Sequence, residues 1–292
     1  MTRDEINAFL DHFTHLLTRP DVTSIDVRAK TTGGKRKSEL ALVIGVVHKK
    51  SRHALTKDVI LPRKVTAEGI ELPTDVFEEG KLVAAQAEGG GMVQTTGLNR
   101  AGSLGVNIQY QGGYNLLSCA HVLTAFDPAF VGAMIQYADS PLDAYANLVP
   151  VTGEVPVTYY NVKNPPAPVL NIHDVAWGNI TPVLGSPNIK QIGVPAGIRQ
   201  AVLNEVVQIY GGNSESLETT TVLSTSARPT MQSTYSDGST IYTFWQNSIS
   251  LDPATAAFIP GDSGSAVVAT SDTNVVGLLF NIGSVSIYAC PL

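Results

Sequence analysis

The most informative stretch of the sequence is PGDSGSAVV, residues 260–268. Its Gly-Asp-Ser-Gly core allows the backbone to turn tightly, and the AVV that follows has the pattern of a short strand. Such a turn can present the hydroxyl of Ser263 while neighbouring N–H groups point at one place. An isolated Asp-Ser-Gly is typical of an ordinary turn, so its interpretation depends on what the rest of the chain contains.

The sequence around this stretch predicts many short strands. From about Val83 onward, runs of Val, Ile, Thr and Tyr alternate with Gly, Asn, Asp and Pro, and no long amphipathic helix interrupts them. This pattern is typical of an all-β barrel or sandwich. The expected strands are Gly105–Tyr110, Tyr114–Ser118, Ala133–Tyr137, Val155–Tyr160, Val206–Tyr210, Thr219–Ser226, Ile241–Trp245, Ser265–Ala269, Val275–Phe280 and Val285–Ala289.

The beginning of the chain has a different pattern. Apolar residues at helical spacing predict a helix over residues 4–18. Strand patterns follow at Thr23–Ala29, Glu39–His48 and Thr74–Glu78. We therefore expect a small α+β domain over residues 1–82 and a separate β-rich domain over residues 83–292.

Composition excludes several classes of function. The 292-residue chain has a net charge of −6 and 15% charged residues, which gives no overall field that attracts nucleic acid or acidic lipid. The longest apolar run, Leu40–Val47, is far too short to span a bilayer. Acidic residues replace the basic start of a signal peptide, and two cysteines do not make a disulfide framework. We therefore expect a cytoplasmic protein with no membrane association.

A serine nucleophile needs a base, because its hydroxyl is barely ionised at neutral pH. Of the six histidines, His121 stands out, since LLSCAHVL places it directly after an apolar strand. The segment HDVAW offers Asp174 at the start of another apolar strand, where it could orient an imidazole. Asp127, Asp139 and Asp143 are the alternatives, all in loop-like sequence. The histidine spacings match no zinc motif.

Together, AHVL, HDVAW and GDSGSAVV resemble the sequence elements of the trypsin/chymotrypsin family of serine peptidases. AGSLGVNIQYQGGYNLLSCAHVL and VVGLLF are similar to an intracellular bacterial and plant subgroup that carries an additional N-terminal domain. The resemblance implies a mainly β, two-barrel trypsin-like fold after the small α+β domain. It also implies a serine endopeptidase that works through an acyl-enzyme intermediate and uses no metal or organic cofactor.

The resemblance also implies roles for individual residues. Ser263 would be the nucleophile, His121 the base and Asp174 the residue that orients it, with the N–H groups of Gly261 and Ser263 as the oxyanion hole. The implied substrate cleft consists of Ala257, Phe258, Phe280, Asn281 and Ile282. Because a small residue, Ala257, stands where trypsins carry an acid, the cleft favours a small or apolar side chain over Lys or Arg.

One departure from the family leaves an alternative open. No activation sequence precedes the first barrel, so Asp262 lacks the new N-terminal amine that processing supplies in many relatives. A catalytically silent or latent module that binds a protein partner is therefore the second hypothesis. The expected partners are a protein or peptide substrate and a regulator at the N-terminal domain, and a homo-oligomer is compatible with the sequence. The basic residues 30–37 are interpreted as a solvated turn, not a nucleic-acid site.

Overall fold

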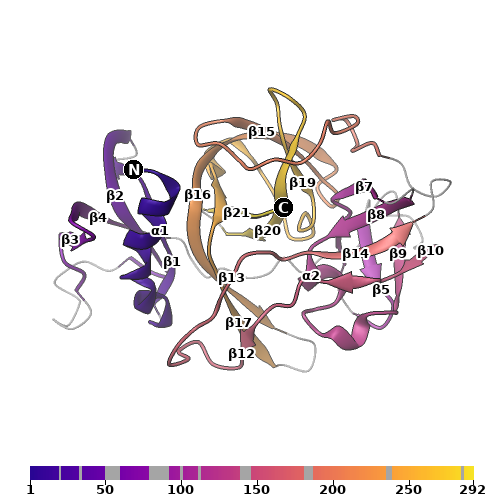
Figure 1. Ribbon diagram of the computed structural model, residues 1–292, viewed down its shortest axis with the longest axis horizontal. Coiled ribbons are helices and arrows are strands. Elements are labelled where there is room, and N and C mark those ends of the chain that lie inside the picture. Colours follow the sequence, from indigo (N-terminus) through magenta and orange to yellow (C-terminus); the bar gives the residue numbers. More distant parts are fainter. Residues whose placement is uncertain are drawn as a thin grey trace.

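In the computed structural model, strands dominate and the helices are short. The structure describes residues 1–19, 21–32, 35–49, 60–78, 92–98, 101–110, 113–138, 146–180, 187–234, 239–283 and 286–292. The elements form an N-terminal unit and two barrels, and the second barrel lies between the other two parts (Figure 1). None of the helices in the described ranges is long and apolar enough to cross a membrane.

Among its described residues, the N-terminal unit contains one α-helix, one 3₁₀ helix and four strands that share an apolar core. Its elements are α1 (Arg3–Asp11), the 3₁₀ helix η1 (Thr14–Thr18), β1 (Val22–Thr32), β2 (Lys35–Val46), β3 (Lys64–Ala67) and β4 (Ile70–Glu78). Thr2 and Glu5 form a reciprocal capping box that fixes the start of α1. The helix expected over residues 4–18 is therefore two pieces. At the break, the Thr14 hydroxyl donates to the carbonyl of Leu10 in the last turn of α1.

Two four-stranded sheets form the first barrel, in the orders β10-β9-β5-β6 and β11-β14-β8-β7. The two sheets meet where β6 leads into β7, and they enclose a common apolar core. The strands are β5 (Met92–Thr95), β6 (Ala101–Ser103), β7 (Val106–Tyr110), β8 (Gly113–Ser118), β9 (Met134–Ala138), β10 (Ala146–Pro150), β11 (Gly153–Glu154) and β14 (Ala176–Ile180). Two short helices follow β8, α2 (Ala120–Leu123) and η3 (Pro128–Phe130).

Six strands close the second barrel. Their order is β15-β19-β20-β21-β18-β16, and an additional pairing of β15 with β16 completes the ring. These strands are β15 (Val206–Gly211), β16 (Ser216–Thr234), β18 (Ser248–Leu251), β19 (Ala266–Ala269), β20 (Val275–Ile282) and β21 (Ile287–Pro291), with η4 (Pro253–Thr255) before β19. The expectation of a mainly β, two-barrel fold is confirmed.

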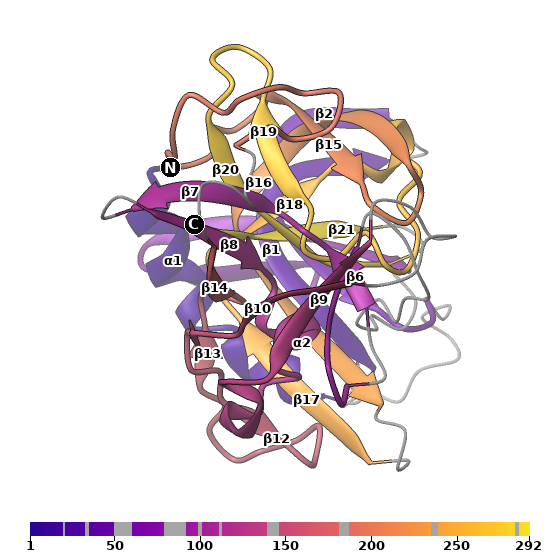
Figure 2. The same ribbon diagram turned by 90° about the vertical axis from the view of Figure 1, so that its right-hand side faces the viewer.

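The long strand β16 connects the second barrel to the N-terminal unit. Its first part belongs to the barrel, whereas its last part pairs with β1, where Ser24 lies opposite Pro229. The same part of β16 pairs with β17 (Thr240–Trp245), which also pairs with β12 (Tyr159–Tyr160) and β13 (Leu170–Asn171). Both views show β12 and β17 side by side at the same end of the molecule (Figures 1 and 2). The N-terminal unit is thus hydrogen-bonded into the barrel sheet.

A buried arginine reinforces this junction. The side chain of Arg228, on β16, is almost completely buried and donates to the Asp11 carboxylate at 2.7 Å and to the Asn7 carbonyl at 3.2 Å. Both acceptors belong to the second half of α1, where a positive charge complements the helix dipole. This contact fixes the N-terminal unit against the second barrel.

One expected strand is largely absent. Of Val155–Tyr160, only the last two residues form a strand, β12. Pro156 has no N–H to donate, and the N–H of Thr158 bonds the Asn171 side chain at 2.9 Å instead of a neighbouring strand. The segment therefore crosses between the barrels as irregular chain.

Candidate active site

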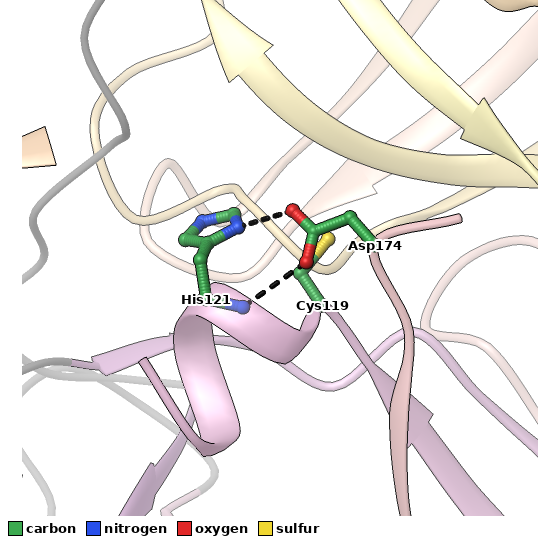
Figure 3. Close-up of side chains that lie close together, drawn as sticks. All are labelled: Cys119, His121 and Asp174. Carbon is green, nitrogen blue, oxygen red and sulfur yellow. Dashed lines mark hydrogen bonds and ion pairs between the residues drawn. The ribbon is translucent and has the colours of Figure 1, made fainter. Parts of the chain in front are cut away.

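His121 and Asp174 meet between the ends of two first-barrel strands. His121 lies in α2, which begins where β8 ends, and Asp174 lies two residues before β14, the neighbour of β8. Asp174 accepts two hydrogen bonds from the same residue, from His121 Nδ1 at 2.6 Å and from the His121 main-chain N–H at 3.0 Å (Figure 3). Because two bonds hold one residue, they fix both the position of α2 and the orientation of the imidazole ring.

This pairing sets the tautomer of the imidazole. An ionised carboxylate can only accept hydrogen bonds, so the proton of a neutral ring must lie on Nδ1 and leave Nε2 as the basic nitrogen. His121 is 1% exposed and Asp174 is fully buried, which keeps the pair away from competing water. Nε2 has no hydrogen-bond partner among the described residues, although it is buried. Such an unpaired group is costly and is available to a hydroxyl or a ligand.

Ser263 lies in a tight turn that is packed against the first barrel. Its carbonyl accepts a 2.6 Å hydrogen bond from the Ser103 N–H, at the end of β6. Gly264 has a φ of +97°, and a Cβ there would lie 2.2 Å from the Ser103 carbonyl oxygen. Only glycine therefore fits after Ser263, which gives the Gly-Asp-Ser-Gly motif its physical reason.

The Ser263 hydroxyl does not bond the His121 ring in this structure. Ser263 Oγ donates instead to the carbonyl of Phe280, on β20, at 3.4 Å. Val122, the residue after His121, and Ser263 both lie against Gly102. A Cβ added to Gly102 would be 2.5 Å from the Val122 side chain and 2.7 Å from the Ser263 carbonyl oxygen. The Val122 side chain and the Ser263 carbonyl thus lie close together, but no hydrogen bond joins the side chains of Ser263 and His121.

Three main-chain N–H groups bind the carboxylate of Asp262. Its Oδ1 accepts from the main-chain N–H groups of Asn213 and Ser214, each at 3.0 Å, and its Oδ2 accepts from Ile259 N–H at 3.0 Å. The carboxylate is fully buried. Main-chain donors thus hold this turn without any N-terminal amine. Sequence reasoning missed Asn213 and Ser214, since nothing in the local sequence marks them as partners of a residue almost 50 positions away.

The two expected oxyanion-hole groups lie on the same turn. The N–H groups of Gly261 and Ser263 make no hydrogen bond to any described part of the chain. Gly261 has a φ of +104°, a conformation that favours glycine. Two unpaired N–H groups on one turn are able to receive an oxyanion.

The expected cleft residues differ in accessibility. Ala257 is exposed and Ile282 is half-buried, whereas Phe258, Phe280 and Asn281 are buried. Neither polar atom of the Asn281 side chain has a partner among the described residues. Most of the residues expected to line the cleft are therefore inaccessible to solvent, and Ser263 itself has no exposed surface.

Cys119 extends the His121–Asp174 pair into a cluster with metal-ligand chemistry. One ligand atom from each of the three residues lies within 4.8 Å of the others (Figure 3). Burial raises the pKa of the Cys119 thiol well above its ordinary value, and a hydrogen bond with Cys290 and the charge of Asp174 raise it further. A protonated thiol is a poor zinc ligand, and the imidazole Nδ1 already shares its proton with Asp174. We assign no metal to this cluster.

Of the alternative acids, Asp127 alone lies among the described residues. The exposed Asp127 caps η3 by accepting from the Ala129 N–H at 2.9 Å. Asp139 and Asp143 lie outside the described residues. The two cysteines are both free and buried, and the Cys290 thiol contacts the Asp174 carbonyl at 3.6 Å. Nothing in the sequence indicates that Cys290 lies beside Asp174.

The barrel topology and the position of these residues between the barrels decide the fold. The chain has the trypsin-like two-barrel fold. Solved structures with a trypsin-like fold similar to it include Thermobifida fusca Protease A, alpha-lytic protease homolog N4 and a Cellulomonas bogoriensis chymotrypsin. They are 14%, 14% and 15% identical to this chain, with TM-scores of 0.41, 0.44 and 0.40. Each covers 70% of this chain, with 91%, 92% and 91% of its own length.

No protein-family model matches the sequence, and no curated protein matches it. The trypsin-like fold by itself does not establish an activity. The function must therefore follow from the site.

Asp262→Asn tests the anchoring of the Ser263 turn. An amide presents an NH₂ group to at least one of the three N–H donors, so one hydrogen bond is lost and the others lose their ionic acceptor. We expect the free energy of unfolding to fall by about 1.5–3 kcal/mol in urea denaturation. Asp252→Asn is the matched control, because Asp252 accepts a single N–H in an exposed turn. Equal stability of the two variants would contradict the anchoring role.

Glu154 gives a prediction on pH. Burial, together with the charge of Asp174, raises its pKa above the ordinary value of 4.5, although a hydrogen bond from Thr124 opposes the shift. A raised pKa means that this acid favours folding at low pH, and that its contribution is lost as pH rises through the folded-state pKa. Glu154→Gln should therefore raise Tm at neutral pH and leave it unchanged near about pH 4. The exposed Glu39→Gln is the control, and an equal shift in both variants would refute the effect.

Proposed function

We propose that this chain is a serine endopeptidase in which Ser263 attacks the peptide carbonyl. The observation that carries the proposal is the double hydrogen bond from His121 to the buried Asp174. It orients an imidazole whose Nε2 is unpaired, next to a turn that carries a serine and two unpaired N–H groups. This combination supplies a base, a nucleophile and donors for a developing negative charge.

The mechanism follows from these positions. A rotation of the Ser263 side chain away from the Phe280 carbonyl brings Oγ to His121 Nε2, which accepts the proton as Oγ attacks. The N–H groups of Gly261 and Ser263 receive the oxyanion, typically a contribution of several kcal/mol. His121 then protonates the leaving amine, and water releases the acyl group by the reverse sequence. Asp174 stabilises the imidazolium during both steps.

The substrate side of the proposal is a polypeptide that binds along Phe280, Asn281 and Ile282 and places a small or apolar side chain near Ala257. The two free cysteines support a reducing, cytoplasmic environment. A regulatory partner at the N-terminal unit is also part of the proposal.

A latent state is the second candidate, and one observation favours it. The Ser263 hydroxyl is buried and is engaged by the Phe280 carbonyl instead of the base. A chain locked in this arrangement would bind partners without hydrolysing them.

Fluorophosphonate labelling tests the proposed function. These probes react with activated serines, so the wild type should form one adduct, and Ser263→Ala and His121→Ala should form none. Hydrolysis of a denatured protein substrate should fall by about 10⁶-fold in Ser263→Ala, since removal of a triad nucleophile has a cost of that order. Ser265→Ala is the matched control on the same turn and should retain labelling. No adduct on a folded wild type would favour the latent state.

A further inference from the structure

Three aromatic rings lie in a row beside the proposed catalytic residues. The Trp245 ring contacts the Phe280 ring at a centroid distance of 5.0 Å and the Phe126 ring at 6.2 Å. Phe126 in turn lies 6.1 Å from the His121 ring. Trp245 and Phe280 are fully buried. The Trp245 side chain thus links the histidine side of the site to the residue whose carbonyl holds Ser263 Oγ.

A substrate cannot reach the site in this arrangement. Attack requires the scissile carbonyl to approach Ser263 Oγ to within about 3–3.5 Å. Ser263 and Asp174 have no exposed surface, and His121 is 1% exposed. The packing beside the nucleophile must therefore open before any hydrolysis.

Trp245 belongs to a strand whose two faces contribute to different cores. Successive side chains of a strand point in opposite directions. Phe244, the preceding residue, packs into the core of the N-terminal unit and meets the Tyr160 ring edge-on at 5.8 Å. Trp245 packs into the core that contains the first barrel and Phe280. The strand β17 therefore connects the N-terminal core mechanically to the proposed active site.

Packing alone holds the Trp245 ring in place. Its only N–H donor, Nε1, is used within the same strand, by the Thr243 hydroxyl at 2.9 Å. No hydrogen bond joins this ring to another described element, so the ring can shift while the main chain of β17 stays paired with β12, β13 and β16.

We propose that β17 is an autoinhibitory strap. The N-terminal core holds Phe244, and this keeps the Trp245 ring packed between Phe280, whose carbonyl contacts Ser263 Oγ, and Phe126, whose ring lies against His121. Any event that loosens Phe244 from the N-terminal core shifts the Trp245 ring and opens the packing beside Phe280 and Phe126, which gives a substrate access to Ser263. This inference rests on the proposed peptidase function, and it gives the N-terminal unit a role in that function.

The first test compares fluorophosphonate labelling rates in full-length variants. Trp245→Ala should react at least about tenfold faster than the wild type, which corresponds to about 1.4 kcal/mol in the opening equilibrium. Phe244→Leu should accelerate labelling as well, although its side chain points away from the site. Trp177→Phe is the control, because Trp177 is the other tryptophan and contacts neither Phe280 nor Phe126 in the aromatic row. Its labelling rate should equal that of the wild type.

The second test measures the strap without any chemistry at Ser263. In the Trp177→Phe background, Trp245 is the sole tryptophan, so acrylamide quenching reports its exposure directly. Quenching should be weak in that protein and should rise when Phe244→Leu is added. Circular dichroism checks that each variant is folded. If Trp245→Ala unfolds, the milder Phe244→Leu variant still tests the proposal.

The outcomes separate the two proposals. Equal labelling rates in the wild type, Trp245→Ala and Phe244→Leu would overturn the strap and leave the peptidase proposal intact. No labelling of any folded variant would overturn the peptidase proposal and the strap together. Unchanged quenching in Phe244→Leu would overturn the link between the N-terminal core and Trp245, whatever the labelling shows.

Discussion

The hydrogen bonds from His121 to Asp174 are the contact on which the site depends. One buried carboxylate accepts from the main chain and from the side chain of the same residue. It thereby fixes where α2 begins, how the imidazole is turned and which nitrogen is basic. Since a buried carboxylate without partners would be very costly, the fold and the chemistry require the same two bonds.

Ser103 forms the second constraint, because it joins the barrels around the nucleophile. Its N–H bonds the Ser263 carbonyl, its hydroxyl donates to the Gly261 carbonyl and accepts from Gly212 N–H, and its carbonyl accepts from Ser118 Oγ. One residue of the first barrel thus orients both ends of the proposed oxyanion turn. Main-chain N–H groups of Asn213, Ser214 and Ile259 anchor Asp262 in the same turn.

Features whose physical constraint is local can be recognised in the sequence. The turn at Ser263 needs glycine at defined positions, and His121 and Asp174 each lie next to an apolar strand, so their motifs are visible in the chain. The pattern also indicated a strand at Ile241–Trp245. It could not reveal that Phe244 and Trp245 enter different cores, because that depends on the pairing of β17 with β12, β13 and β16. The sequence also could not reveal the main-chain donors to Asp262, because Asn213 and Ser214 are distant from it in the chain.

The long β16 strand also changes how the N-terminal residues are understood. Their composition predicts a separate domain, and in the structure β1 continues the sheet of the second barrel while Arg228 bonds α1. A unit attached in this way can transmit a force or a binding event to β17 because both pair with the same strand.

The measurement that tests this account most directly is the proton NMR spectrum of the His121 imidazole. A proton held between Nδ1 and a buried carboxylate at 2.6 Å is protected from exchange and resonates far downfield. The account predicts one such resonance in the wild type and in Ser263→Ala, and its loss in Asp174→Ala and His121→Ala. A spectrum without that resonance, or one in which it survives Asp174→Ala, would contradict the assignment of His121 and Asp174 as the oriented base.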